Sequence, residues 1–148
     1  VAISLVEGGA KLGMRVTTVT PEFNEASRDQ ELLDEAIKTG LYKQTTDLKQ
    51  AIADADVVYT DTWVDMEYFL DPKFAAEKER RIAQMSPYQL NEALLKDSKA
   101  LIMHDMPIHT GYEIDRWAIE HPNSIIFDQA ENRLHAEKAA LVRMLGKG

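Results

Sequence analysis

Short apolar runs alternate with amphipathic stretches along the whole chain. The apolar runs are typical of strands and cover residues 15–20, 56–60, 100–103 and 124–127. Helices are predicted from the helical spacing of apolar residues and from start signals such as Asp47 and Pro87. The predicted helices cover residues 1–12, 29–39, 47–53, 72–84, 88–98, 112–120 and 130–145. This alternation predicts an α/β fold: a doubly wound parallel sheet (Rossmann-like) with helices on both faces.

The first predicted element is a helix, which Gly13 can end. A doubly wound unit normally begins with a strand near the middle of its sheet. No strand pattern precedes this helix, so the sequence predicts that the first strand of the fold is missing from the chain.

The 148 residues suffice for one domain with a substantial core. The net charge of −8 argues against a general nucleic-acid or anionic-membrane surface, while leaving room for a locally basic site. The sequence has no cysteine, which excludes disulfides, thiolate metal sites and a cysteine nucleophile. No apolar run approaches the ~20 residues that span a membrane, and the first residues lack the features of a signal peptide. We therefore expect a cytoplasmic protein.

Polar clusters follow three of the predicted strands, at residues 61–66, 104–107 and 128–133. In open α/β sheets the ligand lies outside the carboxyl ends of the strands. The three segments contribute carboxylates, the imidazole of His104 and, near a helix start, Arg133. An arginine beside helix-start amides suits a phosphate or a carboxylate, and carboxylates suit an amine. We therefore expect one pocket with groups for an anion and for an amine.

Four motifs resemble those of the ornithine carbamoyltransferases, within the aspartate/ornithine carbamoyltransferase superfamily. The resemblance covers essentially the whole chain, as the second, amino-acid-binding domain. Residues 129–135 match the family's QAENRLH in full, where the aspartate branch has Asn-Gly in place of Asn-Arg. Three further motifs match in part: DTWVDME at 61–67 for D-x-W-x-S-M-G, HDMPIHTGYE at 104–113 for HCLPAHRG-x-E, and YQLN at 88–91 for YQVN.

The resemblance implies a reaction in which an amine attacks the carbonyl carbon of carbamoyl phosphate and phosphate leaves, with no cofactor. In the family, the first domain binds most of the carbamoyl phosphate through S-x-R-T-R and H-P-x-Q motifs, and neither occurs here. We therefore expect residues 1–148 to be the amino-acid-binding domain, without the carbamoyl-phosphate-binding domain, and to be inactive alone. The resemblance also implies a homotrimer for the full-length enzyme.

The matching positions carry roles by resemblance. Asp61 would pair with the α-amino group of the substrate, and Met66 would add backbone contacts at that end. Arg133 would reach the carbamoyl phosphate and stabilise the charge that develops on the transferred group. Asp105 and Met106 occupy the two positions that orient the attacking amine and the carbamoyl nitrogen. The remaining predicted substrate-binding residues are Asp65, His104 and Pro107.

Four positions depart from the family motifs. Asp105 replaces a cysteine, Asp65 a serine, Glu67 a glycine, and Thr110 an arginine. Three of these changes add a carboxylate near the expected substrate, and the fourth removes a cation. The hypothesis that follows is an acceptor with more cationic character, or fewer carboxylates, than ornithine. Asp105 is also a candidate base for the attacking ammonium, which must lose a proton to become nucleophilic.

Plain structural roles compete with these assignments. Asp61 at a strand end suits an N-cap or a turn, and His104 and Pro107 suit loop shaping. Arg133 has the spacing to pair with Glu137 on a helix surface.

Two rival functions also stay open at this stage. One is a non-catalytic relative that keeps the fold and binds a cationic amine. The other is a metal-dependent enzyme that uses His104, Asp105 and His109. No distant fourth ligand accompanies these three residues in the sequence, so we do not expect a metal site.

Overall fold

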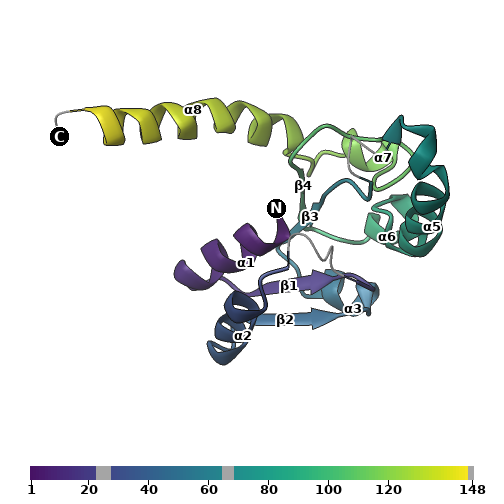
Figure 1. Cartoon of the computed structure of the whole chain (residues 1–148), viewed down its shortest axis with the longest axis horizontal. Helices are drawn as coiled ribbons and strands as arrows, with labels where there is room; N and C mark the ends of the chain where they lie inside the picture. The colour runs from purple at the N-terminus through teal and green to yellow at the C-terminus, as the bar shows by residue number, and fades with distance from the viewer. Residues whose placement is uncertain (23–27, 65–68, 147–148) are drawn as a thin grey trace.

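The computed structural model describes residues 1–22, 28–64 and 69–146 (Figure 1). Its helices alternate with parallel strands, which confirms the predicted α/β class. Within these ranges, no helix combines the length and the apolar character that a membrane span requires. The elements are α1 (Ala2–Lys11), β1 (Val16–Val19), α2 (Gln30–Lys38), β2 (Tyr42–Thr45), α3 (Leu48–Ala53), β3 (Val57–Thr60), η2 (Pro72–Phe74), α5 (Ala75–Met85), η3 (Ser86–Tyr88), α6 (Glu92–Leu95), β4 (Leu101–His104), α7 (Arg116–Ile119) and α8 (Ile126–Leu145).

Strands β1 and β2 pair in parallel, with Val16 opposite Tyr42. Helices α1 and α2 contact this pair and each other. Gly9 allows the close approach of α1, because a Cβ atom at this position would lie 2.4 Å from Cγ2 of Val16. The resulting apolar cluster consists of Val6, Leu33, Ala36 and Tyr42.

Strands β3 and β4 also pair in parallel, with Val57 opposite Leu101 and Thr60 opposite His104. Both strands therefore end at the same level, and the residues that follow them leave the sheet at one edge. The larger apolar cluster lies around this pair and consists of Ile52, Val58, Leu90, Leu95, Ala100, Ile102, Ile114, Ala118 and Ile126. The four described strands thus form two pairs and not one continuous sheet.

The predicted strand at 124–127 is wrong. Ser124 forms only an isolated parallel bridge with Ile102, and the backbone turns into α8 at Ile126. Ile126 is fully buried in the larger cluster. The apolar run at 124–127 is therefore explained by the buried start of helix α8 and not by a strand. A short apolar run does not distinguish these two structures by its periodicity.

Strand β2 was missed because its sequence, YKQT, buries only Tyr42. Two predicted helices are also shorter than expected. Residues 88–98 contain α6, which begins after Asn91, and residues 112–120 contain α7, which begins after Asp115. The side chains of Asn91 and Asp115 accept hydrogen bonds from backbone N–H groups three residues later and so fix these late starts. Asp47 caps α3 in the same way, as predicted.

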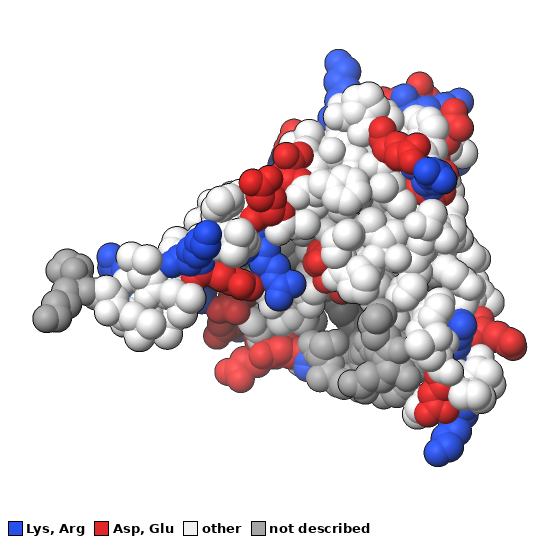
Figure 2. Space-filling view, turned by 90° about the horizontal axis from the view of Figure 1, so that it is seen from above, with Lys and Arg blue, Asp and Glu red and all other residues white. Residues whose placement is uncertain are grey.

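Helix α8 leaves the body of the molecule and extends into solvent (Figure 1). Residues 131–146 are all exposed. Charged side chains of both signs lie along the part of α8 that Figure 2 shows. Large apolar side chains are exposed on the same helix as well, and they include Leu134, Leu141, Val142, Met144 and Leu145.

This contrast predicts that replacing a side chain by alanine lowers the free energy of unfolding by different amounts at the two ends of α8. We expect Ile126→Ala to lower the free energy of unfolding by about 2–4 kcal/mol, because it leaves a cavity in the core. Leu141→Ala, the matched change at an exposed position of the same helix, should cost less than about 0.5 kcal/mol. Urea denaturation followed by circular dichroism measures both. Equal costs would show that Ile126 does not anchor the helix.

Candidate active site

Two carboxylates follow the adjacent ends of β3 and β4. Asp61 comes directly after β3 and Asp105 directly after β4, and both side chains are partly buried. Burial raises the pKa of Asp105, and the neighbouring negative charge of Asp61 raises that pKa further. Oδ1 of Asp105 is buried without a hydrogen-bond partner in the described part of the chain. Two of the three polar segments therefore bring their carboxylates close together.

Asp61 also has a local structural contact. Its Oδ1 accepts a hydrogen bond from the backbone N–H of Thr62 at 2.7 Å. This contact fixes one carboxylate oxygen beside the strand end. A carboxylate has acceptor capacity for further donors, so this bond is compatible with binding an ammonium group.

Tyr59 on β3 lies near the two carboxylates. Burial raises the pKa of its phenol to about 12, with further increases from the charges of Asp105 and Asp61. The Tyr59 hydroxyl accepts a hydrogen bond from Nε2 of Gln129 at 3.0 Å, while Oε1 of Gln129 accepts one from the backbone N–H of His104 at 3.0 Å. Gln129 therefore joins the start of α8 to the ends of both strands.

His104 is completely buried, and both of its ring nitrogens have partners. Nδ1 accepts a hydrogen bond from the backbone N–H of Met106 at 2.9 Å, so the ring proton belongs on Nε2. Nε2 lies 3.2 Å from Oε1 of Glu113, to which it donates. This geometry describes a neutral imidazole that shapes the loop, which favours the structural role considered for His104.

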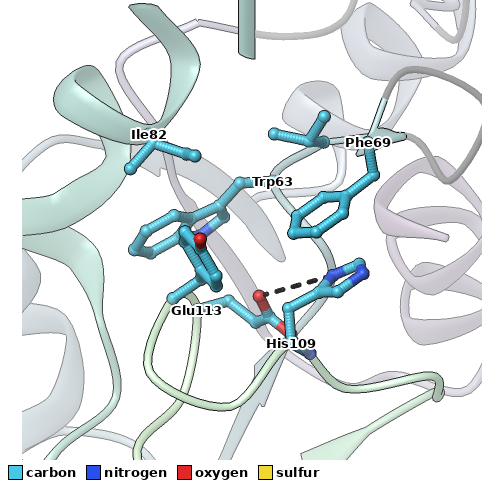
Figure 3. A pocket seen from close by; sticks show the side chains of 7 residues that line it. Trp63, Phe69, Ile82, His109 and Glu113 are labelled. Carbon is cyan, nitrogen blue, oxygen red and sulfur yellow. Dashed lines mark hydrogen bonds and ion pairs between the residues drawn. The ribbon is translucent and has the colours of Figure 1, made fainter. Parts of the chain in front are cut away.

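A small aromatic hollow lies next to this loop (Figure 3). Phe69 stacks on the ring of His109, with ring centroids 4.1 Å apart and planes 6° apart. Trp63 and Tyr112 also line the hollow, and the carboxyl group of Glu113 forms part of its wall. The segment after β3 and the segment after β4 therefore contact each other through aromatic rings.

Arg133 lies on the exposed part of α8. Its Nε donates to Oε1 of Glu137 at 3.0 Å, and its side chain is 76 % exposed. The ion pair predicted as the plain alternative is thus present in this structure. An exposed pair of this kind contributes little to stability, so the guanidinium can change partner at small cost.

Of the other predicted residues, Met106 and Pro107 belong to the loop after β4. Both are exposed, and Met106 has a φ of 65°, in the left-handed region. Asp65 and Met66 lie outside the described residues.

In the described ranges, no group of three or more potential metal ligands is gathered. The two occupied ring nitrogens of His104 also argue against the metal site considered with Asp105 and His109.

Two residues of the site were not predicted from the sequence. Glu113 lies within one of the matched motifs, but nothing in its position indicated that it would be buried against His104. Gln129 lies two residues after the predicted strand at 124–127, and the signal that could have found it is its place in the polar cluster at 128–133. Both make contacts that depend on how β4, its loop and α8 come together.

Comparison with known proteins defines the class to which this α/β domain and its strand-end site belong. The family model described as "Aspartate/ornithine carbamoyltransferase, Asp/Orn binding domain" matches residues 1–144. The chain belongs to the aspartate/ornithine carbamoyltransferase family.

Its relatives are ornithine carbamoyltransferases. The chain is 41 % identical to the enzyme of Archaeoglobus fulgidus over 147 residues, which cover 97 % of this chain and 45 % of that protein. The structure of ornithine carbamoyltransferase from Pyrococcus furiosus superposes with a TM-score of 0.81 at 40 % identity, over 96 % of this chain and 45 % of that one. The enzyme of Gloeobacter violaceus gives 0.78 at 34 %, over 99 % and 48 %. The chain thus spans about half the length of these relatives.

Proposed function

We propose that this chain provides the acceptor-binding half of a carbamoyltransferase site. The amine of ornithine or a related acceptor attacks the carbonyl carbon of carbamoyl phosphate, a C–N bond forms, and the C–O bond to phosphate breaks. Phosphate leaves with the electron pair of that bond. The observation that carries the proposal is the pair Asp61 and Asp105 at adjacent strand ends, in a chain of this family.

Asp105 has the chemistry to remove the proton that blocks attack. An alkylammonium has no lone pair on nitrogen, so it must lose a proton before it can attack a carbonyl carbon. The raised pKa of Asp105 brings this carboxylate closer to the basicity that an efficient general base needs at neutral pH. Asp61 would meanwhile hold a second ammonium, the α-amino group in an amino-acid substrate.

Met106 and Arg133 would complete the reacting centre. Met106 follows Asp105 in the loop and would orient the carbamoyl nitrogen. Arg133 would exchange Glu137 for carbamoyl phosphate, where its positive charge would stabilise the charge that develops on the transferred group. Asp65, Met66, His104 and Pro107 remain the other proposed residues around the acceptor, with His104 acting through the loop.

The remainder of the full-length protein would bind carbamoyl phosphate. We propose that it packs on α8, the helix that contains Arg133 and whose apolar side chains are exposed in this chain. Residues 1–148 alone would then be inactive. The proposal includes a homotrimer for the full-length protein, which the resemblance implies, and a cytoplasmic location.

The proposed acceptor can be tested with a panel of amines. The full-length protein should carbamoylate putrescine or agmatine, which lack the carboxylate of ornithine, at least as well as ornithine, because Asp105 adds negative charge to the pocket. Release of phosphate from carbamoyl phosphate, measured with ornithine, lysine, putrescine and agmatine, gives the order of preference. Asp105→Cys, which restores the family residue, should shift that order toward ornithine.

A strong preference of the unchanged protein for ornithine would contradict the acceptor hypothesis while leaving carbamoyl transfer in place. The second candidate function, a non-catalytic amine-binding relative, is favoured by the loss of the family's serine, cysteine and arginine. It predicts no phosphate release with any amine. It also predicts no binding of an analogue in which a carbamoyl phosphate mimic is joined to ornithine.

A further inference from the structure

We propose that Glu113 is a positioning residue for carbamoyl transfer, which holds both ends of the loop that presents Asp105 and Met106. This inference rests on the proposed function above. Glu113 would act without touching the substrate, through His104 at one end of the loop and His109 at the other.

The burial of Glu113 sets it apart from the other carboxylates. It is 1 % exposed, and with the fully buried His104 it makes up the buried polar or charged residues of the described chain. A carboxylate at such a depth is costly unless donors satisfy it. The two donors to Oε1 of Glu113 come from the end of β4 and from the loop after it: Nε2 of His104 at 3.2 Å and the backbone N–H of His109 at 2.6 Å.

These contacts fix the loop from both sides. His104 ends β4 and passes the constraint to Met106, whose backbone N–H donates to Nδ1 of the imidazole at 2.9 Å. His109 closes the other side, four residues before Glu113. Asp105 and Met106 lie between the two points, so their positions depend on the carboxyl group of Glu113.

The local backbone explains why such a hold is needed. Met106 has a φ of 65°, in the left-handed region, which is unfavourable for a residue with a Cβ. Such a conformation persists only when surrounding contacts impose it. The hydrogen bond from Met106 to His104 supplies one such contact, and Glu113 keeps the imidazole in the tautomer that can accept it.

The two carboxyl oxygens of Glu113 differ in their contacts, since Oε1 accepts both hydrogen bonds. Oε2 is buried without a hydrogen-bond partner within the described ranges, and Nδ1 of His109 lies 4.0 Å away, beyond hydrogen-bond distance. An acceptor oxygen at Oε1 is therefore the feature that matters. This separates the proposal from a role for Glu113 as a base, which would require its negative charge.

Three variants of the full-length protein separate these possibilities. Glu113→Gln keeps an acceptor oxygen and loses the charge, whereas Glu113→Leu loses both. Glu120→Gln is the control, since Glu120 is an exposed carboxylate paired with Arg116 at 2.8 Å. For each variant, kcat and KM are measured for the acceptor amine and for carbamoyl phosphate, together with Tm.

We expect Glu113→Leu to lower kcat about 100-fold, since a displacement of about 1 Å at the reacting groups has an effect of this size. The KM for carbamoyl phosphate should stay within about 3-fold, and Glu113→Gln should recover most of kcat. Equal losses in Glu113→Gln and Glu113→Leu would overturn the proposal in favour of a charge role. A lower Tm for Glu113→Leu, with kcat per folded site unchanged, would overturn it in favour of a purely structural role.

A measurement on the unchanged protein keeps the proposal testable if Glu113→Leu does not fold. The ¹⁵N NMR spectrum of the histidine rings at pH 7 should show His104 with a proton on Nε2 and none on Nδ1. A proton on Nδ1 would overturn the link between Glu113 and Met106. If the unchanged protein transfers no carbamoyl group to any amine, the proposed function fails, and the spectrum still decides whether Glu113 holds the loop.

Discussion

Asp105→Asn is expected to lower kcat for carbamoyl transfer by about 100-fold or more in the full-length protein. The change keeps the size of the side chain and removes the base, and a positioned general base contributes on the order of 10²–10⁴-fold. Phosphate release at saturating concentrations of both substrates measures the effect. Asp97→Asn, at an exposed position between α6 and β4, is the control and should leave kcat unchanged.

The same substitution should not destabilise the protein. Because the pKa of Asp105 is raised in the folded state, the folded protein favours the protonated carboxyl, and that contribution to stability is lost as pH rises through the folded-state pKa. At neutral pH the ionised side chain therefore opposes folding, and an uncharged asparagine removes this cost. We expect the Tm of Asp105→Asn at pH 7 to equal or exceed that of the unchanged protein. A clearly lower Tm would show that the carboxylate has a stabilising partner.

Arg133→Gln should lower kcat by about 100- to 1,000-fold, the cost of removing one group that stabilises developing charge. Its ion pair with Glu137 lies on the exposed surface of α8, so stability should change little. Steady-state kinetics with carbamoyl phosphate and the acceptor amine measure the loss.

Arg116→Gln is a close control for this prediction. Arg116 makes the same kind of exposed pair, with Nε 2.8 Å from Oε1 of Glu120 four residues later. It lies on α7 and has no proposed role in the site. If Arg133→Gln and Arg116→Gln have the same kcat, Arg133 serves only as the ion-pair partner of Glu137.

The strand ends could be predicted because they carry a strong signal. A short apolar run followed within two residues by a carboxylate marks both β3 with Asp61 and β4 with Asp105. The parallel pairing of the two strands then brings the carboxylates together, as the fold class requires. The run at 124–127 carries the same signal and nevertheless starts a helix, because burial of Ile126 is compatible with either structure.

The residues that hold the site in place, Glu113 and Gln129, could not be predicted from the sequence in the same way. Glu113 lies nine residues from His104, and this spacing matches neither a helix nor a strand period. Gln129 connects Tyr59 and His104 across three elements, so its partners appear only once β3, β4 and α8 are in place. Contacts of this kind depend on tertiary structure, which a local pattern does not contain.

The dependence of kcat/KM on pH tests the central claim most directly, with the unchanged protein and Asp105→Asn compared on the same acceptor amine. A base must be ionised to act, so kcat/KM of the unchanged protein should fall as pH drops through the raised pKa of Asp105. Asp105→Asn should lose this acidic limb and retain only the effect of amine ionisation. Profiles of the same shape in both proteins would contradict the proposal that Asp105 deprotonates the acceptor.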